Sequence, residues 1–148
     1  MAQGDLTVFD EFVLDLGKKV HNLSADTIKV GIIDNTTPPT AADATPRWGD
    51  YSGNEVSAAG GYVADGLTLS GVTFTESGGT ATFDDTGNIS LSQDGSGFTD
   101  GYWGIIYNST AGNNEAIAFV DLGGPVSEQA GPVNINWNAS GILTIATS

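Results

Sequence analysis

The sequence predicts a mainly β protein, an antiparallel β-sandwich or jelly roll with one N-terminal helix. After Leu23, short apolar runs alternate with polar residues and are separated by turn residues, a pattern typical of strands. Glycine supplies 21 residues and serine with threonine 28, which suits turns and half-buried strand positions. A chain of 148 residues can bury its own core, and no linker or repeat divides it, so we expect a single domain over 1–148.

Residues 5–20 are predicted to form the only helix. Apolar residues recur there at helical spacing, and Gly17 followed by two lysines is typical of a helix C-terminus. The main stripe consists of Leu6, Phe9, Phe12, Val13, Leu16 and Val20. Val8 and Leu14 fall outside it, so the helix is more apolar than a one-sided surface helix requires. We expect it either to cap the open end of the sandwich or to place part of its surface against another subunit.

Several strand patterns carry more specific expectations. In residues 67–75 the apolar phase changes at Gly71, and a bulge there would restore one buried face. The turn at residues 77–79 predicts a hairpin. Residues 102–107 and 116–122 are apolar on both faces, so we place them in the middle of a sheet. Either this chain or a neighbouring subunit must then cover both faces of that sheet.

Two further segments complete the outline. Residues 34–46 form a long loop whose prolines, Pro38 and Pro39 among them, cannot join a ladder. We consider this loop a candidate arm that lies across a neighbouring subunit. At the C-terminus, the alternating residues 133–138 are expected to return through a turn into a strand at 142–146.

The charge distribution limits the possible partners. The chain has 4 basic and 18 acidic residues, a net charge of −14, and no lysine or arginine after Arg47. A chain without cations over its last 101 residues cannot clamp phosphates there, so we expect no nucleic acid as partner. Most of its carboxylates are expected in solvent or facing a basic partner. The N-terminus does not resemble a secretory signal and no apolar run suits a membrane span, so we expect synthesis in the cytoplasm and no membrane partner.

No constellation of residues predicts catalysis. The chain has no cysteine, and no nucleophile-elbow motif accompanies its one histidine. That histidine, His21, follows the helix beside two lysines, where we expect a solvated side chain. Glu55, Glu76, Glu115 and Glu128 are available for a carboxylate pair, but most lie in turn-like contexts where a solvated acid is expected. The acidic turns do not match a calcium loop. We therefore expect no enzyme activity, no catalytic residue, no metal and no cofactor.

Two stretches together carry a resemblance to a known class of proteins. One is TPPTAADATPRWGDYSGNEV (37–56) with GGY (60–62), and the other is YWGIIY (102–107) with FVDLGGPV (119–126) and INW (135–137). Over most of its length the chain resembles small structural proteins of tailed bacteriophages, and capsid decoration (cement) proteins are the favoured branch. The resemblance implies a β-rich, often trimeric protein that sits on the major capsid protein of the virion and needs no cofactor.

The leading hypothesis is therefore a decoration protein that stabilises the phage head by bridging capsomers through area buried between subunits. We expect the assembly contacts among large apolar residues of the N-terminal third, although a place in the chain's own core is the alternative for each. The candidates are Leu6, Phe9, Phe12, Pro38, Pro39, Trp48 and Tyr51.

Two other hypotheses stay open. The chain could be a receptor- or glycan-binding module on the phage tail or head, with aromatic stacking faces and a row of amides on one strand. These residues are Trp48, Tyr51, Tyr62, Trp103, Asn134, Asn136 and Asn138. Alternatively, the acidity serves only solubility or tolerance of salt and identifies no partner.

Overall fold

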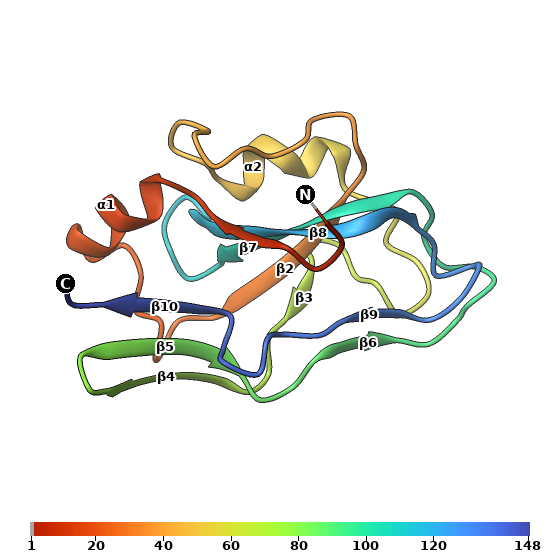
Figure 1. Cartoon of the computed structure of the whole chain (residues 1–148). Coiled ribbons are helices and arrows are strands. Elements are labelled where there is room, and N and C mark those ends of the chain that lie inside the picture. Colours follow the sequence, from red (N-terminus) through yellow and green to blue (C-terminus); the bar gives the residue numbers. More distant parts are fainter. Residues whose placement is uncertain (1) are drawn as a thin grey trace.

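Antiparallel strand pairing organises the chain in the computed structural model, which describes residues 2–148 (Figure 1). The largest sheet has the strand order β1-β8-β7-β2-β3, a second has the order β10-β5-β4, and a third pairs β6 with β9. The strands are β1 (Leu6–Val8), β2 (Ile28–Ile33), β3 (Leu67–Thr68), β4 (Val72–Ser77), β5 (Thr80–Asp85), β6 (Ile89–Leu91), β7 (Gly101–Asn108), β8 (Ala116–Val126), β9 (Val133–Ile135) and β10 (Leu143–Ala146). The helices are α1 (Glu11–Gly17), α2 (Trp48–Tyr51) and the 3₁₀ helix η1 (Ser52–Asn54). The predicted mainly β class is confirmed.

The two smaller sheets together form one layer below the five-stranded sheet (Figure 1). Phe83 of β5 pairs with Leu143 of β10, and Ile89 of β6 pairs with Ile135 of β9. Ile89 comes six residues after Phe83, and Ile135 comes eight residues before Leu143. The two ladders therefore follow the same pair of chain segments with an offset of two residues. Between the two ladders, the main-chain N–H of Trp137, which follows β9, donates to Oδ1 of Asn88, which precedes β6, at 3.0 Å.

The main core lies between these two layers. Strands of the upper sheet contribute buried side chains such as Val30 and Ile106, and the lower layer contributes Phe83 and Ile135. A single face of each sheet is enough to build this core, as expected for antiparallel layers that alternate apolar and polar residues.

A second core covers the opposite face of the five-stranded sheet. Residues 34–56, the covering segment, place Trp48 and Tyr51 over that face, where Ile105 and Phe119 are also buried. The Trp48 ring stacks on Tyr107 with centroids 5.1 Å apart and an interplanar angle of 4°. The prediction that 102–107 and 116–122 lie mid-sheet is confirmed, and the chain itself covers both of their faces.

Close approach of the Trp48 ring depends on a glycine. Gly31 lies beneath the indole, and a Cβ atom at this position would come within 2.2 Å of a ring carbon. A side chain there would force the covering segment away from the sheet, since the indole and the β2 backbone cannot both stay in place.

The N-terminus differs from the predicted helix over 5–20. Residues 6–8 form β1, which pairs with β8, and α1 begins only at Glu11 and ends at Gly17. Leu6 and Val8 pack on the main core, whereas Phe9 is buried in the second core. The apolar residues that suggested one face of a helix therefore belong to two cores on opposite faces of the sheet. Pairing with the edge of β8 overrides the helical pattern, because the edge offers hydrogen bonds and burial together.

Two strand predictions were also wrong in detail, and one was confirmed. Gly71 marks no bulge within a single strand but the crossing from β3 in the upper sheet to β4 in the lower layer. β10 pairs with β5 and β9 with β6, so the C-terminal strands do not pair with each other. The hairpin at 77–80 is present, with Gly78 and Gly79 both at positive φ. No helix within residues 2–148 has the length and apolar character that crossing a membrane requires.

Candidate functional site

The structure places most of the predicted assembly residues inside the chain. Phe12 belongs to the main core and Phe9, Trp48 and Tyr51 to the second core, all four at most 3% exposed. Leu6 is half-buried against the main core. These side chains therefore contribute to folding, and as placed they offer little surface to a partner.

The predicted arm is likewise held against its own sheet. Pro39 is buried and Pro38 is exposed. Asp43 fastens the loop, because its carboxylate accepts hydrogen bonds from Thr40 Oγ1 at 2.5 Å and from the Tyr51 hydroxyl at 2.7 Å. Burial works to raise the pKa of Asp43, but these hydrogen bonds outweigh it and hold the pKa below its ordinary value. Within the single chain, this loop lies over the outer face of β7 and β8.

The most conspicuous surface feature is the outer face of α1. Val13 is 73% and Leu14 49% exposed, and with Val63 they are the large apolar side chains that residues 2–148 leave exposed. Lys18 and Lys19 come directly after Gly17, the last residue of α1. Both side chains are exposed, and neither lies within 4.0 Å of a carboxylate in the described chain. We call Val13, Leu14, Lys18 and Lys19 the α1 patch. It joins exposed apolar surface to half of the chain's four cations.

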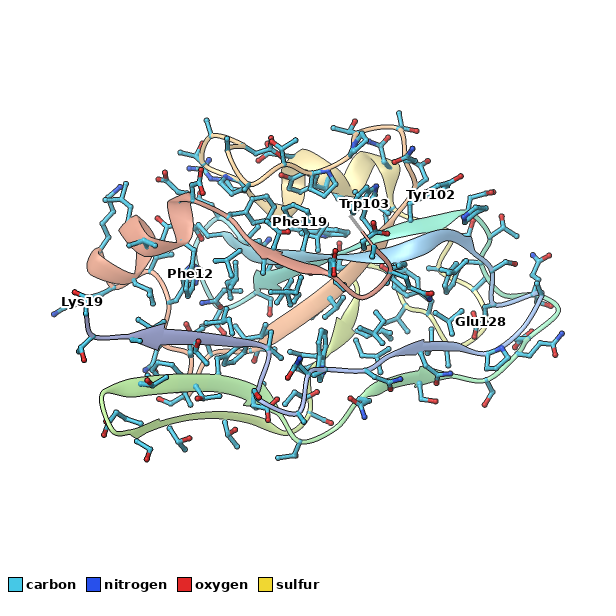
Figure 2. All side chains as sticks on the ribbon, in the orientation of Figure 1. Phe12, Lys19, Tyr102, Trp103, Phe119 and Glu128 are labelled. Atoms are coloured by element: carbon cyan, nitrogen blue, oxygen red, sulfur yellow. The ribbon has the colours of Figure 1, made fainter. Side chains whose placement is uncertain are left out.

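The inner face of α1 is anchored by polar and aromatic contacts. Phe12 points from the helix into the space between the layers, whereas Lys19 points away from the molecule (Figure 2). The Phe12 ring lies 5.5 Å from that of His21, measured between centroids. Asp15 is buried, and its Oδ2 lies 3.9 Å from His21 Nε2. Burial, reinforced by the nearby Glu11 and Glu115 carboxylates, raises the pKa of Asp15.

His21 lies in a polar network rather than in solvent. Asn108 Nδ2 lies 2.6 Å from Asp26 Oδ2 and 3.2 Å from His21 Nδ1. Because Asn108 Nδ2 is a donor, Nδ1 is the acceptor and the ring proton is assigned to Nε2, which has no hydrogen-bond partner in the described chain. Burial lowers the pKa of His21 despite the opposing Glu115 and Asp26 carboxylates. No serine lies among the hydrogen-bond partners of this ring, so the network forms no nucleophile–base pair.

Glu128, one of the acids named from the sequence, is buried. Its side chain is 1% exposed at the end of the molecule opposite Lys19, contrary to the solvated position that its turn-like context predicted (Figure 2). The Gly61 N–H donates to Oε1 at 2.8 Å, while Oε2 has no partner in the described chain. A Cβ on Gly60 or Gly97 would come within 2.5 Å of this carboxylate, so the glycines make room for it. Glu128 therefore joins loops that are distant in sequence.

A groove opens where the two layers separate at one edge, and we call it the edge groove. It has a volume of about 650 Å³ and lies between β8, β9 and the residues that precede β1. Its walls include Val120, Leu122, Val133 and Ile135, with Asp121 and exposed amides at the rim, and no lysine or arginine lines it. Nothing in the sequence pattern marked this position, because the groove depends on how the layers diverge.

The residues proposed for glycan stacking do not form a platform. Trp48 and Tyr62 are buried, and Trp103 is half-buried with its Nε1 donating to Asn35 Oδ1 at 2.9 Å. Asn134 and the other amides of the row are exposed, and Asn134 Oδ1 already accepts a hydrogen bond from Ser90. No tryptophan of the chain is exposed, which counts against a stacking site for sugars.

Comparisons with known proteins identify no relative. No family model matches the chain, and neither the curated proteins nor the solved structures contain a match. Within residues 2–148, no three histidine, aspartate or glutamate side chains are grouped so that they could hold a metal ion. The α1 patch remains the most conspicuous exposed feature of the described chain.

Proposed function

We propose that this protein is a structural component of a tailed-phage virion, a capsid decoration protein that binds the major capsid protein through the α1 patch. The observation that carries the proposal is the exposure of Val13 and Leu14 beside Lys18 and Lys19. Exposed apolar side chains next to cations are typical of a contact surface that is covered in an assembly. The resemblance of the sequence to phage structural proteins supplies the identity of the assembly.

Charge gives the proposed contact a direction. Lys18 and Arg47 line the same small notch beside α1, together with the carboxylates of Glu11, Asp15 and Glu115. With Lys19 next to Lys18 in the chain, three of the four cations belong to this end of the molecule. Seven carboxylates lie in residues 1–47 and 11 in the remainder, which has no cation. With the α1 patch on the shell, the acidic remainder faces solvent and particles repel one another.

In this proposal the protein stabilises heads by bridging neighbouring capsid subunits, as a homo-oligomer for which a trimer is favoured. Association that buries surface only in the assembled shell shifts the equilibrium toward the intact particle. Heads that lack the protein should then lose resistance to heat and osmotic shock. Heads of unchanged stability would contradict the decoration role.

The α1 patch can be tested with matched variants. Val13→Asp and Leu14→Asp each place a charge within the patch. Val63→Asp instead changes an exposed valine in a loop outside the patch. We expect the two patch variants to occupy heads at least about tenfold less well than the wild type, since charge removed from water without a partner is costly. Val63→Asp should bind normally. Equal occupancy for all three variants, measured by quantitative gel analysis of purified heads, would exclude this docking surface.

A further inference from the structure

The strand β4 is an open edge of the lower layer. It is the last strand of the order β10-β5-β4, and no other helix or strand lies below it in Figure 1. Its six residues make it the longest edge strand of the described chain, since β1, β3, β6, β9 and β10 have between two and four residues each. A long edge strand is a template for pairing with another chain.

The register shows which main-chain groups of β4 point outward. Ser77 and Thr80 flank a two-residue turn, so they exchange main-chain hydrogen bonds. At the other end of the ladder, the Thr86 N–H donates to Gly71 O. Because hydrogen-bonded positions alternate along an antiparallel ladder, the odd-numbered residues of β4 bond to β5. The N–H and C=O groups that point outward therefore belong to the even-numbered residues, Val72, Phe74 and Glu76.

This edge lacks the features that usually keep strand edges apart. Residues 72–77 contain no proline and no lysine, and their register with β5 is regular, without a bulge. Glu76 is the one charged residue among them, and its Oε1 accepts a hydrogen bond from the Gly79 N–H at 2.7 Å. That bond holds the carboxylate toward the hairpin turn. The main-chain groups of β4 are thus accessible to a further strand.

The order of residues along β4 suits a second copy of the same strand. In an antiparallel pair centred on Phe74, this residue lies opposite its own counterpart, and Val72 lies opposite Glu76, so every outward N–H and C=O group gains a partner. On the exposed face, Thr73 lies opposite Thr75. Cross-strand aromatic pairs and threonine pairs both stabilise sheets. In this register no carboxylate of β4 faces another, whereas a pair centred on Glu76 would bring two carboxylates together.

We propose that two copies of the chain associate through their β4 edges. The two lower layers then form one sheet of the order β10-β5-β4-β4-β5-β10. Antiparallel pairing of identical strands has a two-fold axis, so this contact closes after two copies. In a decorated head it would connect copies that belong to neighbouring trimers. The contact uses no residue of the α1 patch and does not rest on the proposed function, so either proposal can fail alone.

The contact is expected to be weak in free solution. One pair of strand edges buries less than the about 1,600 Å² of a standard interface, and two chains of charge −14 repel each other. Sodium chloride at about 0.3 M gives a Debye length of about 6 Å, which screens this long-range repulsion but not the interaction of adjacent strands. Sedimentation equilibrium of the full chain under these conditions should show a reversible dimer between about 10 μM and about 1 mM protein. A chain that stays monomeric throughout would overturn the proposal.

Paired substitutions test the register. Thr73→Glu with Thr75→Glu places like charges opposite each other in the dimer, whereas Thr73→Lys with Thr75→Glu places opposite charges there. The control pair, Ser57→Glu with Ala58→Glu, adds the same charge to an exposed loop outside β4. We expect the first pair to weaken dimerisation about fivefold relative to the control pair, and the Lys–Glu pair to dimerise at least as tightly as the wild type. Equal dissociation constants for the two β4 pairs would overturn the pairing, as would equal constants for the first pair and the control.

Hydrogen exchange tests the wild type without any substitution. The outward amides of β4 should exchange more slowly at about 1 mM than at about 10 μM protein, because they are bonded only in the dimer. The Ala146 amide is the internal control. The Thr147 N–H donates to Gly79 O, so the preceding Ala146 N–H points outward from β10, at the opposite edge of the sheet. Its exchange should not depend on concentration, and equal protection at both edges would overturn pairing through β4.

Discussion

His21 is the residue whose surroundings depart furthest from the sequence-based expectation. The sequence predicts a solvated side chain at the end of a helix, whereas the imidazole is buried between Phe12, Asn108 and Asp15. One of these contacts, that with Asn108, comes from a strand 87 residues further along the chain. Periodicity in the local sequence carries no information about such a contact. Glu128 was misplaced for the same reason, since its glycine neighbours come from two other loops.

Acidification should therefore destabilise the fold through His21. Its pKa lies below the ordinary 6.5 in the folded chain, so the unfolded chain takes up a proton first as the pH falls through about 6.5. The free energy of unfolding should then decrease between about pH 7.5 and about pH 5.5. Urea titrations of the wild type and of His21→Gln measure this, since glutamine can still accept from Asn108 but does not titrate. An equal slope in both proteins would show that other groups cause the effect.

At the scale of elements, alternation and turn chemistry were the reliable signals. The two-face-apolar runs became β7 and β8, and the glycine pair at 78–79 became a hairpin, because these patterns depend on near neighbours. Pairing partners were less predictable. Residues 67–75 divide between two sheets at Gly71, where a Cβ would come within 2.1 Å of Thr86 Oγ1. Packing between the two layers determines where the chain crosses from one sheet to the other. The apolar pattern of one strand does not predict that position.

The covering segment offers a direct test at this scale. Tyr51→Phe removes the hydroxyl that donates to Asp43 and leaves the ring in the second core. We expect a loss of about 1 kcal/mol in the free energy of unfolding, because a hydrogen bond to the half-buried Asp43 carboxylate is lost. Limited proteolysis should also cut residues 36–45 faster. Tyr102→Phe is the matched control, since its hydroxyl makes no hydrogen bond in the described chain, and similar losses in both variants would refute the anchoring role of Tyr51.

At the scale of the whole molecule, the strand and turn patterns predicted the mainly β fold class but not which residues contact one another. The buried apolar residues form two cores on opposite faces of the five-stranded sheet. That arrangement absorbs Phe9, Trp48 and Tyr51, which the sequence offered as assembly contacts. Among the described residues, the large apolar side chains that stay exposed are Val13, Leu14 and Val63. The position of Leu14 outside the main apolar stripe was the feature of the sequence that indicated an exposed apolar surface on the helix.

Net charge should make stability depend on salt. A charge of −14 with few internal ion pairs leaves the folded chain under self-repulsion, which added salt screens. We expect the thermal midpoint to rise between about 0.02 M and about 0.5 M sodium chloride, within the range where the Debye length shortens most. Sucrose of equal osmolality serves as the control for nonionic effects. A midpoint that falls with salt would indicate that attractive charge pairs dominate instead.

The one-sided placement of the cations also determines how the protein will adsorb. On a positively charged resin or sensor surface, the carboxylates of the cation-free part make contact, while Lys18, Lys19 and Arg47 are repelled and turn outward. An adsorbed layer would then display Val13 and Leu14 to the solution in one orientation. Immobilisation by simple ion exchange, without a tag, thus prepares a surface on which candidate binding partners meet the α1 end first.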